Sequence, residues 1–288
     1  MVYENPIKLI ECPRDAMQGL KEFISTADKI RYINALLKVG FHTIDFGSFV
    51  SPAAVPQMKD TAEVLNGLQL GETKSKLLAI VANVRGAVEA SQFEEISYLG
   101  FPLSVSETFQ QKNTNKSIEE AFGVVADIQN ICIQKNKQQV VYLSMGFGNP
   151  YGDPYDSDYI LKFTEKLYQM GIRIISPSDT IGVSDKENIK FLFSNLIPAF
   201  PDVEFGAHLH STPESVKEKL NAAYAAGCRR FDGAIKGFGG CPMADNELTG
   251  NIATERMIGF FEDQKVTLGI DNEKLQDAML IASEIFPS

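Results

Sequence analysis

Two of the three histidines in this chain lie one residue apart, in the segment GAHLHSTPES at residues 206–215. If the segment is a β-strand, alternate side chains point to the same side of it, so His208 and His210 face the same way. A rise of ~3.3 Å per residue places their Cα atoms about 7 Å apart, which allows both imidazoles to bind one ion. We therefore expect a metal site here; two half-buried, hydrogen-bonded rings without an ion are the alternative.

The ligand types indicate which ions suit such a site. A structural zinc site usually has four protein ligands that include cysteine, whereas two imidazoles with oxygen ligands leave positions open for a substrate. We expect a divalent cation, Mg²⁺ or Mn²⁺, with Zn²⁺ or Co²⁺ as alternatives. Such an ion can polarise a hydroxyl or carbonyl oxygen and stabilise the negative charge that develops on it.

The segment PRDAMQ at residues 13–18 places Arg14 beside Asp15. An isolated pair of this kind is usually a surface ion pair. At the end of a buried strand, however, the carboxylate can bind a metal while the guanidinium binds a substrate oxyanion. We expect this second arrangement, because it gives an acidic protein a local positive field for an anionic substrate.

The elements that would position these residues follow a regular alternation. Eight short apolar runs alternate with longer segments of helical spacing, which predicts a (β/α)8 barrel, or TIM barrel, as one domain over residues 1–288. A helical extension is expected at about 265–288, and a doubly wound sheet is the alternative fold. Gly40, Gly171 and Gly227 end helical segments and suit C-terminal caps. The expected strands are residues 7–12, 41–46, 76–82, 95–100, 139–145, 172–177, 203–210 and 229–235, and the clearest helical segments are 30–40, 117–135, 159–171 and 213–227.

In such a barrel, catalytic side chains lie at the carboxyl ends of the strands. Polar or reactive residues follow most of the expected strands, so we expect them to share one rim. His42 instead opens the second strand, at the opposite end, and is expected to be structural. The expected rim residues are Arg14, Asp15, Asp45, Ser48, Asn83, Ser106, Glu107, Asn149, Asp179, His208, His210 and Cys241.

The segment KGFGGCP at residues 236–242 has three glycines close to one cysteine. A simple turn with a buried small residue and a cradle for phosphate are two interpretations of it. A third is a mobile lid that brings the thiol of Cys241 onto bound substrate. A thiol with a pKa near ~8.5 is mostly protonated at neutral pH and can act as a general acid.

The composition restricts the class of protein. With 44% hydrophobic and 22% charged residues, the chain is typical of a globular protein. A net charge of −10 without a long basic run argues against nucleic acid or an anionic membrane as partner. The four cysteines form no CxxC pair, which argues against a disulfide framework or zinc knuckle. No long apolar span or signal-peptide pattern occurs, so we expect a cytoplasmic protein.

Several motifs occur in the order found in one enzyme family. Together they resemble the 3-hydroxy-3-methylglutaryl-CoA (HMG-CoA) lyase family and, more broadly, the related metal-dependent TIM-barrel lyases and synthases, over about residues 7–260. PRDAMQ resembles the family's P-R-D-G-L-Q, and SFVSPAAVPQM is similar to its S-F-V-S-P-x-x-V-P-Q-M. SDTIGV resembles G-D-T-I-G-V, HLH resembles H-x-H, GFGGCP resembles G-x-G-G-C-P, and TGNIATE resembles S-G-N-x-A-T-E.

The resemblance implies cleavage of a carbon–carbon bond in HMG-CoA, which gives acetoacetate and acetyl-CoA. It also implies that Arg14 steadies the enolate oxygen of the thioester product and that Cys241 is the thiol of a lid. Gln18, Ser48 and Asn83 are expected to line the substrate site together with Arg14. The implied metal ligands are Asp15, His208, His210 and Asn251, and the candidates for proton transfer, among which the sequence does not choose, are Asp15, Asp45 and Asp179.

The chain departs from the family pattern near the predicted rim. These departures leave the implied metal ligands in place but affect the residues expected around the substrate. Asp45 stands where the family has Glu, and Ser211 stands where it has Asp. The other departures are residues 144–153 (SMGFGNPYGD), which lack the two cysteines of C-x-x-G-C-P-Y-E-G; Cys12 and Ala16 in place of glycines; and one residue inserted between Cys241 and Asn251.

Three functional hypotheses follow. The first is a metal-dependent lyase that cleaves HMG-CoA, with an acyl-CoA as its partner molecule. The second is a related lyase or condensing enzyme that acts on another 3-hydroxyacyl-CoA or hydroxy acid. The third is a catalytically silent barrel that binds a metabolite. A homodimer through the outer helices is a further expectation.

Overall fold

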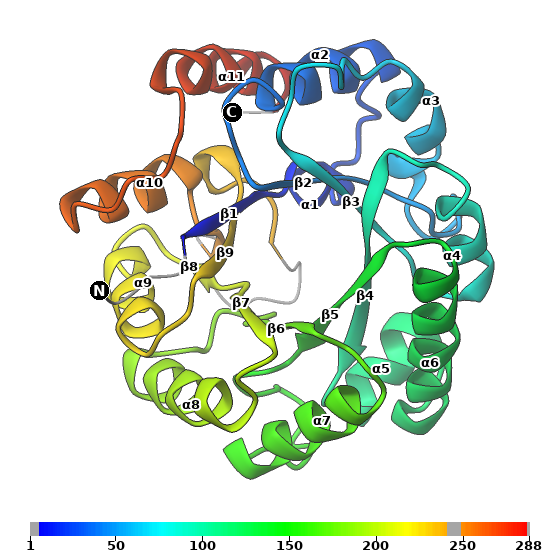
Figure 1. Cartoon of the computed structure of the whole chain (residues 1–288), viewed down its shortest axis with the longest axis vertical. Coiled ribbons are helices and arrows are strands. Elements are labelled where there is room, and N and C mark those ends of the chain that lie inside the picture. The colour runs from blue at the N-terminus through cyan, green and yellow to red at the C-terminus, as the bar shows by residue number, and fades with distance from the viewer. Residues whose placement is uncertain (1–5, 241–248, 287–288) are drawn as a thin grey trace.

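The computed structural model describes residues 6–240 and 249–286. Eight parallel strands form a closed barrel that is surrounded by helices (Figure 1). The predicted (β/α)8 barrel is therefore confirmed, and the doubly wound alternative is wrong. The barrel strands are β1 (Lys8–Glu11), β2 (Thr43–Ser48), β3 (Lys76–Ile80), β4 (Ile96–Ser104), β5 (Gln138–Ser144), β6 (Ile174–Pro177), β7 (Glu204–Ala207) and β9 (Arg230–Gly233).

The strands pair in the order in which they occur along the chain, and β9 closes the ring against β1. In this closing pair, Leu9 lies opposite Phe231. The strands are buried along most of their length, as expected of a parallel sheet that is covered by helices. A small apolar cluster fills the inside of the barrel, and its buried members are Leu78, Tyr98, Val140, Tyr142 and Ile174.

β4 ends later than expected. The sequence predicts an end at Gly100, but the pairing with β5 continues to Ser104, which lies opposite Ser144. A Cβ on Gly100 would lie 2.6 Å from Cδ1 of Ile80. The glycine therefore marks close packing inside the barrel rather than a turn.

The expected seventh strand, residues 203–210, is wrong in its extent. β7 ends before His208, and a separate strand, β8 (His210–Ser211), pairs antiparallel with β10 (Gly250–Asn251). His208 lies between the two and still forms a bridge to Ser178 after β6. The chain leaves the barrel here because the partner of β8 is a remote segment rather than the neighbouring barrel strand.

Most of the helices pack on the outside of the barrel, whereas the short helix α1 (Pro13–Gln18) lies inside this ring of helices, against β2 (Figure 1). All four expected helical segments form helices, although the first of them begins earlier than expected, at Thr26. Within the described residues, no helix is both long and apolar enough to cross a membrane. The helices are α1 (Pro13–Gln18), α2 (Thr26–Leu36), α3 (Thr61–Asn66), α4 (Val84–Ala90), α5 (Glu107–Thr114), α6 (Ile118–Gln134), α7 (Ser157–Gln169), α8 (Lys186–Ala199), α9 (Val216–Ala225), α10 (Thr254–Asp263) and α11 (Asn272–Ile285), with 3₁₀ turns η1 (Pro56–Met58) and η2 (Ile235–Gly237).

Local sequence signals mark several helix ends. At the start of α6, the Ser117 side chain accepts from the Glu120 N–H, and the Glu120 carboxylate accepts from the Ser117 N–H, which forms a capping box. Gly40, Gly171 and Gly227 follow helices α2, α7 and α9 with φ values of 100°, 86° and 101°. This left-handed conformation favours glycine, and the predicted caps at Gly171 and Gly227, which directly follow the C-cap residues of α7 and α9, are confirmed. The cap predicted at Gly40 is wrong, because α2 ends at Leu36 with Leu37 as its C-cap residue and Gly40 lies three residues further along the chain.

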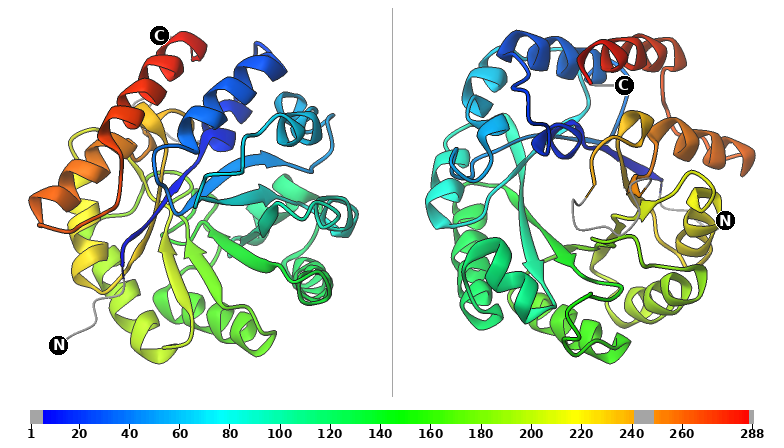
Figure 2. Two further views of the ribbon diagram at one scale, coloured as in Figure 1. Left: turned by 45° about the horizontal axis from the view of Figure 1, so that its top comes forward. Right: turned by 180° about the vertical axis from the view of Figure 1, so that it is seen from behind.

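The C-terminal helix α11 lies against α2 (Figure 2). It falls within the segment where the sequence predicts a helical extension. The Phe286 ring, just after α11, stacks on Phe238 at a centroid distance of 4.5 Å and meets the edge of Tyr32 at 5.7 Å. The end of the chain is thereby joined to the segment that follows β9.

A charged network occupies the amino-terminal end of the barrel. Arg230 donates from Nη1 to Oε1 of Glu204 at 3.0 Å, and Lys8 pairs with the same carboxylate. His42 lies nearby, just before β2, and burial, followed by the charges of Lys8 and Arg230, lowers its pKa to about 4. This imidazole is therefore neutral at pH 7 and lies at the end of the barrel opposite the rim, as expected.

Glu11 links the end of β1 to the segment after β9 and to α10. The Ile235 N–H donates to its Oε1 at 2.9 Å, and the Thr254 hydroxyl donates to its Oε2 at 2.5 Å. Burial raises the pKa of Glu11 to about 8, although both hydrogen bonds oppose the shift. Much of the folded population therefore carries a neutral, protonated Glu11 near pH 7.

Glu11→Gln is expected to remove part of the pH dependence of stability. Between the ordinary pKa of 4.5 and about 8, the folded chain keeps a proton that the unfolded chain has released. The free energy of unfolding contributed by this group therefore falls as pH rises through that range and is constant outside it. The glutamine of the variant cannot ionise. The free energy of unfolding, measured with urea, should therefore fall less between pH 5 and pH 8 in the variant than in the parent, by roughly 2–4 kcal/mol. The exposed control Glu89→Gln should decline like the parent; equal declines in all three would contradict the assignment.

Candidate active site

Asp15, His208 and His210 come together at the carboxyl end of the barrel. One ligand atom from each side chain lies within 4.8 Å of the other two. The centroids of the two imidazole rings are 5.4 Å apart. The acid and the two imidazoles that the sequence singled out thus form one cluster, although His210 belongs to β8 and not to a barrel strand.

The ring of His210 is oriented to bind a cation. Its Nδ1 lies 3.1 Å from the carbonyl oxygen of Thr180, so a proton on Nδ1 leaves a lone pair on Nε2. Nε2 is buried, and it has no hydrogen-bond partner in the part of the chain that the structure describes. Burial, followed by the charge of His208, lowers the pKa of this imidazole to about 4, so it is neutral at pH 7. A neutral imidazole with an unpartnered buried nitrogen fits a divalent cation.

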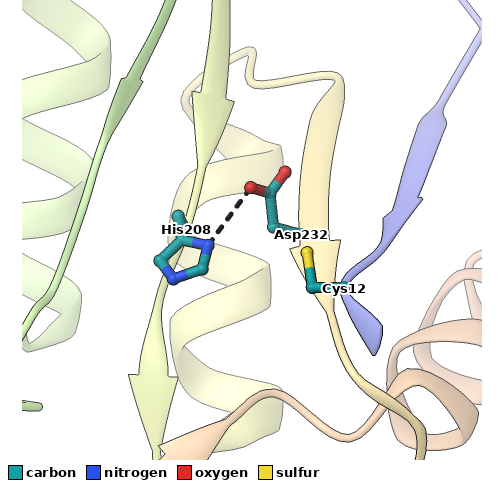
Figure 3. Close-up of side chains that lie close together, drawn as sticks. All are labelled: Cys12, His208 and Asp232. Atoms are coloured by element: carbon teal, nitrogen blue, oxygen red, sulfur yellow. Dashed lines mark hydrogen bonds and ion pairs between the residues drawn. The ribbon is translucent and has the colours of Figure 1, made fainter. Parts of the chain in front are cut away.

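Asp232, on β9, orients the ring of His208 (Figure 3). Its Oδ2 lies 3.1 Å from Nδ1 of His208, which leaves Nε2 as the ring atom available to a cation. Burial lowers the pKa of His208, but the hydrogen bond to Asp232 and its charge outweigh burial, and the net shift is upward. A carboxylate behind a metal-binding imidazole fixes the orientation of the ring and increases its basicity.

Cys12, at the end of β1, lies beside this pair (Figure 3). Its Sγ, a ring nitrogen of His208 and a carboxylate oxygen of Asp232 lie within 4.8 Å of one another. Burial, followed by the charges of Asp232 and Asp45, raises the pKa of the thiol well above its ordinary value. Without a bound cation, Cys12 is therefore a neutral, buried thiol.

Asn251 reaches the cluster because β10 pairs with β8, where it lies opposite His210. Its Nδ2 donates to Oδ2 of Asp15 at 2.6 Å and to the Phe238 carbonyl at 2.9 Å. The amide is therefore fixed beside the carboxylate, and its oxygen is the group that could bind a cation. Spacing in the sequence did not single out this residue; only the family resemblance did.

Three side chains hold Arg14 at the mouth of the barrel. Its Nε and Nη2 donate to Oδ2 of Asp45 at 3.0 and 2.5 Å. Its Nη1 donates to Asp15 at 3.0 Å and to Gln18 at 2.8 Å. Gln18 also donates to Asp15 at 3.0 Å and so braces the pair. Arg14 is 8% exposed, so solvent screens its charge little and it can stabilise an anionic oxygen.

The environment separates the pKa values of the two carboxyl groups bound to Arg14. Burial alone would raise the pKa of Asp15, but Arg14 and the two imidazoles outweigh it and lower the value to about 2. Burial raises the pKa of Asp45 to about 6, because Arg14 offsets only part of the effect. Asp15 is thus a permanent anion that suits a metal ligand, whereas Asp45 can exchange a proton near neutrality.

Asp179, just after β6, has a different set of partners. Its Oδ2 accepts from Lys219 Nζ at 2.9 Å, from the Ser184 hydroxyl at 2.5 Å and from the Ser184 N–H at 3.1 Å. Its backbone N–H donates to the carbonyl of His208 at 2.9 Å. Asp179 is therefore joined to the metal-binding cluster through the backbone. Its Oδ2 accepts three hydrogen bonds, whereas its Oδ1 is buried and has no hydrogen-bond partner among the described residues.

Ser48 and Asn83 lie at the ends of β2 and β3, as expected, and form hydrogen bonds within their own loops. The Ser48 hydroxyl accepts from the Val50 N–H at 3.3 Å. The Asn83 side chain accepts from the Gly86 N–H at 2.9 Å and caps α4. Their roles in substrate binding stay predictions.

Segment 144–153, which departs from the family pattern, is fastened to the loop after β4. The Ser106 hydroxyl donates to Asp153 at 2.5 Å. The Asn149 amide donates to the Asp153 carbonyl at 3.0 Å. Glu107 accepts a backbone N–H at the start of α6. These three expected rim residues thus shape the loops around the mouth.

The glycine-rich segment after β9 packs directly on the metal-binding residues. Gly239 has a φ of +85°, and a Cβ there would lie 2.8 Å from the Asp15 carbonyl oxygen and 2.9 Å from Nδ2 of Asn251. This close approach explains the glycine without a phosphate ligand. Cys241, the expected lid thiol, lies outside the described residues.

Two residues of the site were missed in the sequence. Asp232 lies in the middle of the predicted strand 229–235, so the rule that nominated Asp45 and Asp179 did not select it; the observed β9 ends at Gly233, directly after Asp232. Lys219 lies on the buried face of α9 with Val216 and would have stood out as a charge at an apolar helical position. Its partner could not be read from that pattern.

The sequence of this chain matches a known protein family over almost its whole length. Residues 7–281 match the HMGL-like family. The chain belongs to this family. It is 32% identical over 282 residues to the hydroxymethylglutaryl-CoA lyase of Bacillus subtilis, an alignment that covers 96% of this chain and 92% of that protein. It is 33% identical to the mitochondrial hydroxymethylglutaryl-CoA lyase of Homo sapiens, with 94% and 83% covered.

Solved structures of HMGL-like proteins agree closely with the fold. The HMG-CoA lyase of Bacillus subtilis superposes with a TM-score of 0.92 at 31% identity and covers 100% of this chain and 97% of that one. An HMG-CoA lyase of A. baumannii in complex with coenzyme A and 3-methylmalate superposes with a TM-score of 0.90 at 27% identity, with 99% and 92% covered.

Asp232→Asn is expected to weaken the metal site while it preserves the shape of the side chain. The charge that supports His208 would be lost, so affinity for Mn²⁺, measured by isothermal titration calorimetry, should fall about 10-fold or more. Asp202→Asn, an exposed change of the same type, is the control. Unchanged affinity in a folded Asp232→Asn protein would show that Asp232 does not support the site.

Gly239→Ala is expected to displace the metal-binding residues, because its Cβ would meet Asp15 and Asn251. The lyase activity, measured as acetyl-CoA release, should fall on the order of 100-fold, because a displacement of about 1 Å in a catalytic site has an effect of this size. Gly259→Ala, in α10 with no heavy atom within 4 Å of the added Cβ, is the control and should retain activity. If both variants retain activity, the close approach of Gly239 to Asp15 and Asn251 is not needed for the site, which would contradict the prediction.

Proposed function

We propose that this protein is a divalent-metal-dependent carbon–carbon lyase that cleaves HMG-CoA to acetoacetate and acetyl-CoA. The observation that carries the proposal is the cluster of Asp15, His208 and His210, in which the buried Nε2 of His210 has no partner among the described residues. Arg14 lies directly beside this cluster and can bind an anionic oxygen. The relatives named above, all HMG-CoA lyases, support the same substrate.

The cation is proposed to be Mg²⁺ or Mn²⁺, because imidazole, carboxylate and amide oxygen ligands suit both ions. When bound, it polarises substrate oxygens and stabilises developing negative charge. A coenzyme A thioester is supported by the coenzyme A complex of the A. baumannii enzyme. The expected homodimer and cytoplasmic location stay predictions. The residues that would hold the cation are Asp15, His208, His210 and Asn251.

The proton-transfer steps follow from the pKa values. Asp45, with a pKa of about 6, is mostly ionised at pH 7 and accepts the proton of the tertiary hydroxyl. The electron pair of the broken O–H bond forms the new carbonyl of acetoacetate, and the electron pair of the broken C–C bond forms the enolate of acetyl-CoA. Arg14 stabilises the enolate oxygen, and the thiol of Cys241 donates a proton to the enolate carbon. The proton on Asp45 restores the thiol through solvent after product release.

A different substrate is the second candidate, because the surroundings of the metal site differ from the family pattern. Asp45 is one methylene shorter than the glutamate in the family, and segment 144–153 is fastened by Asp153. Another 3-hydroxyacyl-CoA or hydroxy acid, cleaved or formed by condensation, would use the same metal ligands and Arg14. A catalytically silent barrel is less well supported, since the complete ligand cluster and Arg14 are present.

The direct test is the release of acetyl-CoA from HMG-CoA by purified protein with Mg²⁺ or Mn²⁺ under reductant. His208→Ala should lower turnover by more than about 100-fold, since even changes behind a metal ligand cost 10–100-fold. Cys241→Ser should lower it strongly, and His42→Gln, at the opposite end of the barrel, should leave it nearly unchanged. Metal binding without turnover would favour the second candidate, and failure to bind metal would contradict both.

A further inference from the structure

Lys219 is a charged side chain at an apolar position of helix α9. The residues at i, i+3, i+4 and i+7 of this face, from Val216 to Ala223, are all buried. The side chain of Lys219 is 6% exposed, and its ammonium group reaches past the helix to the metal-binding cluster. An ammonium group in this position is stable only if its donors are matched by acceptors.

The ammonium group has two acceptors, and one of them belongs to a metal-binding residue. Nζ donates to Oδ2 of Asp179 at 2.9 Å and to the backbone carbonyl of His210 at 2.7 Å. The backbone N–H of Asp179 in turn donates to the carbonyl of His208 at 2.9 Å. Lys219 and Asp179 together therefore hold the main chain at both histidines.

The position of His210 affects more than its own ring. Residue 210 begins β8, and its pairing with Asn251 brings that amide to the cluster. β8 is only two residues long, so few of its own hydrogen bonds fix it. A buried bond to its first carbonyl therefore has a large share in placing both His210 and Asn251.

We propose that Lys219 is a positioning residue that sets the affinity of the site for its cation by holding the His210 carbonyl. The inference rests on the proposed metal-dependent function and adds a determinant that touches neither substrate nor cation. It also gives Asp179 a role. Its Oδ2, with three donors, is the ion-pair partner that holds Lys219 in place.

The competing explanation is that Lys219 only neutralises a buried carboxylate. The two explanations separate in a charge-matched double variant. Lys219→Met leaves Asp179 buried without a cation, and Asp179→Asn leaves Lys219 buried without an anion, so both single variants should lose stability. Lys219→Met combined with Asp179→Asn removes both charges and should recover the stability of the parent. The His210 carbonyl, however, still lacks the hydrogen bond that Lys219 donates.

The experiment measures Mn²⁺ affinity by isothermal titration calorimetry and stability by thermal denaturation on the full-length parent and variants. Lys219→Met and the double variant should both bind Mn²⁺ about 10-fold or more weakly, while the double variant melts near the parent. Lys217→Met is the matched control, because this lysine on the same helix is 73% exposed and pairs only loosely with Asp263 at 3.5 Å. It should bind Mn²⁺ like the parent.

Each other outcome contradicts a specific claim. Parent-like Mn²⁺ affinity in the double variant would show that Lys219 acts only as a counter-charge, and would overturn the positioning role. Parent-like Mn²⁺ affinity in Lys219→Met, together with loss of binding in His210→Ala, would also overturn the positioning role. That result would still support the metal site itself. Failure of the parent itself to bind Mn²⁺ would contradict the proposed function and, with it, this inference.

Discussion

The burial of four carboxylates around one end of the barrel is the constraint on which the site depends. An ionised carboxylate away from water is stable only beside compensating positive charge or donated hydrogen bonds. Three partners, each from a different element, supply it here. Arg14 on α1 binds Asp45 and Asp15, Lys219 on α9 binds Asp179, and His208 after β7 binds Asp232.

The same constraint explains why the site suits a divalent cation. The side chains of Arg14 and Lys219 face a larger number of carboxyl groups at the mouth, those of Asp15, Asp45, Asp179 and Asp232. Nε2 of His210, which has no partner among the residues that the structure describes, indicates the same need. In a protein of net charge −10, a bound cation and Arg14 together create the local positive field that an anionic thioester substrate requires.

Much of the fold and part of the site follow from local pattern. Alternating apolar runs and helical segments predicted the barrel, and polar residues after the strands predicted its rim. Local pattern failed where remote segments decide the structure. Gly100 suggests a strand end but serves close packing inside β4, and the expected strand at 203–210 breaks because β8 finds its partner at β10. Asn251 was found only through family resemblance for the same reason.

The sequence by itself determined the chemistry that is available: two imidazoles and an aspartate for a cation, an arginine for an oxyanion, and a barrel to present them. Residue type and the periods of strands and helices are local properties, so they can be read along the chain. Only the tertiary structure decided which charges meet. It placed Asp232 behind His208 and Lys219 beneath His210, because a buried charge takes its partner from whichever segment the fold brings near.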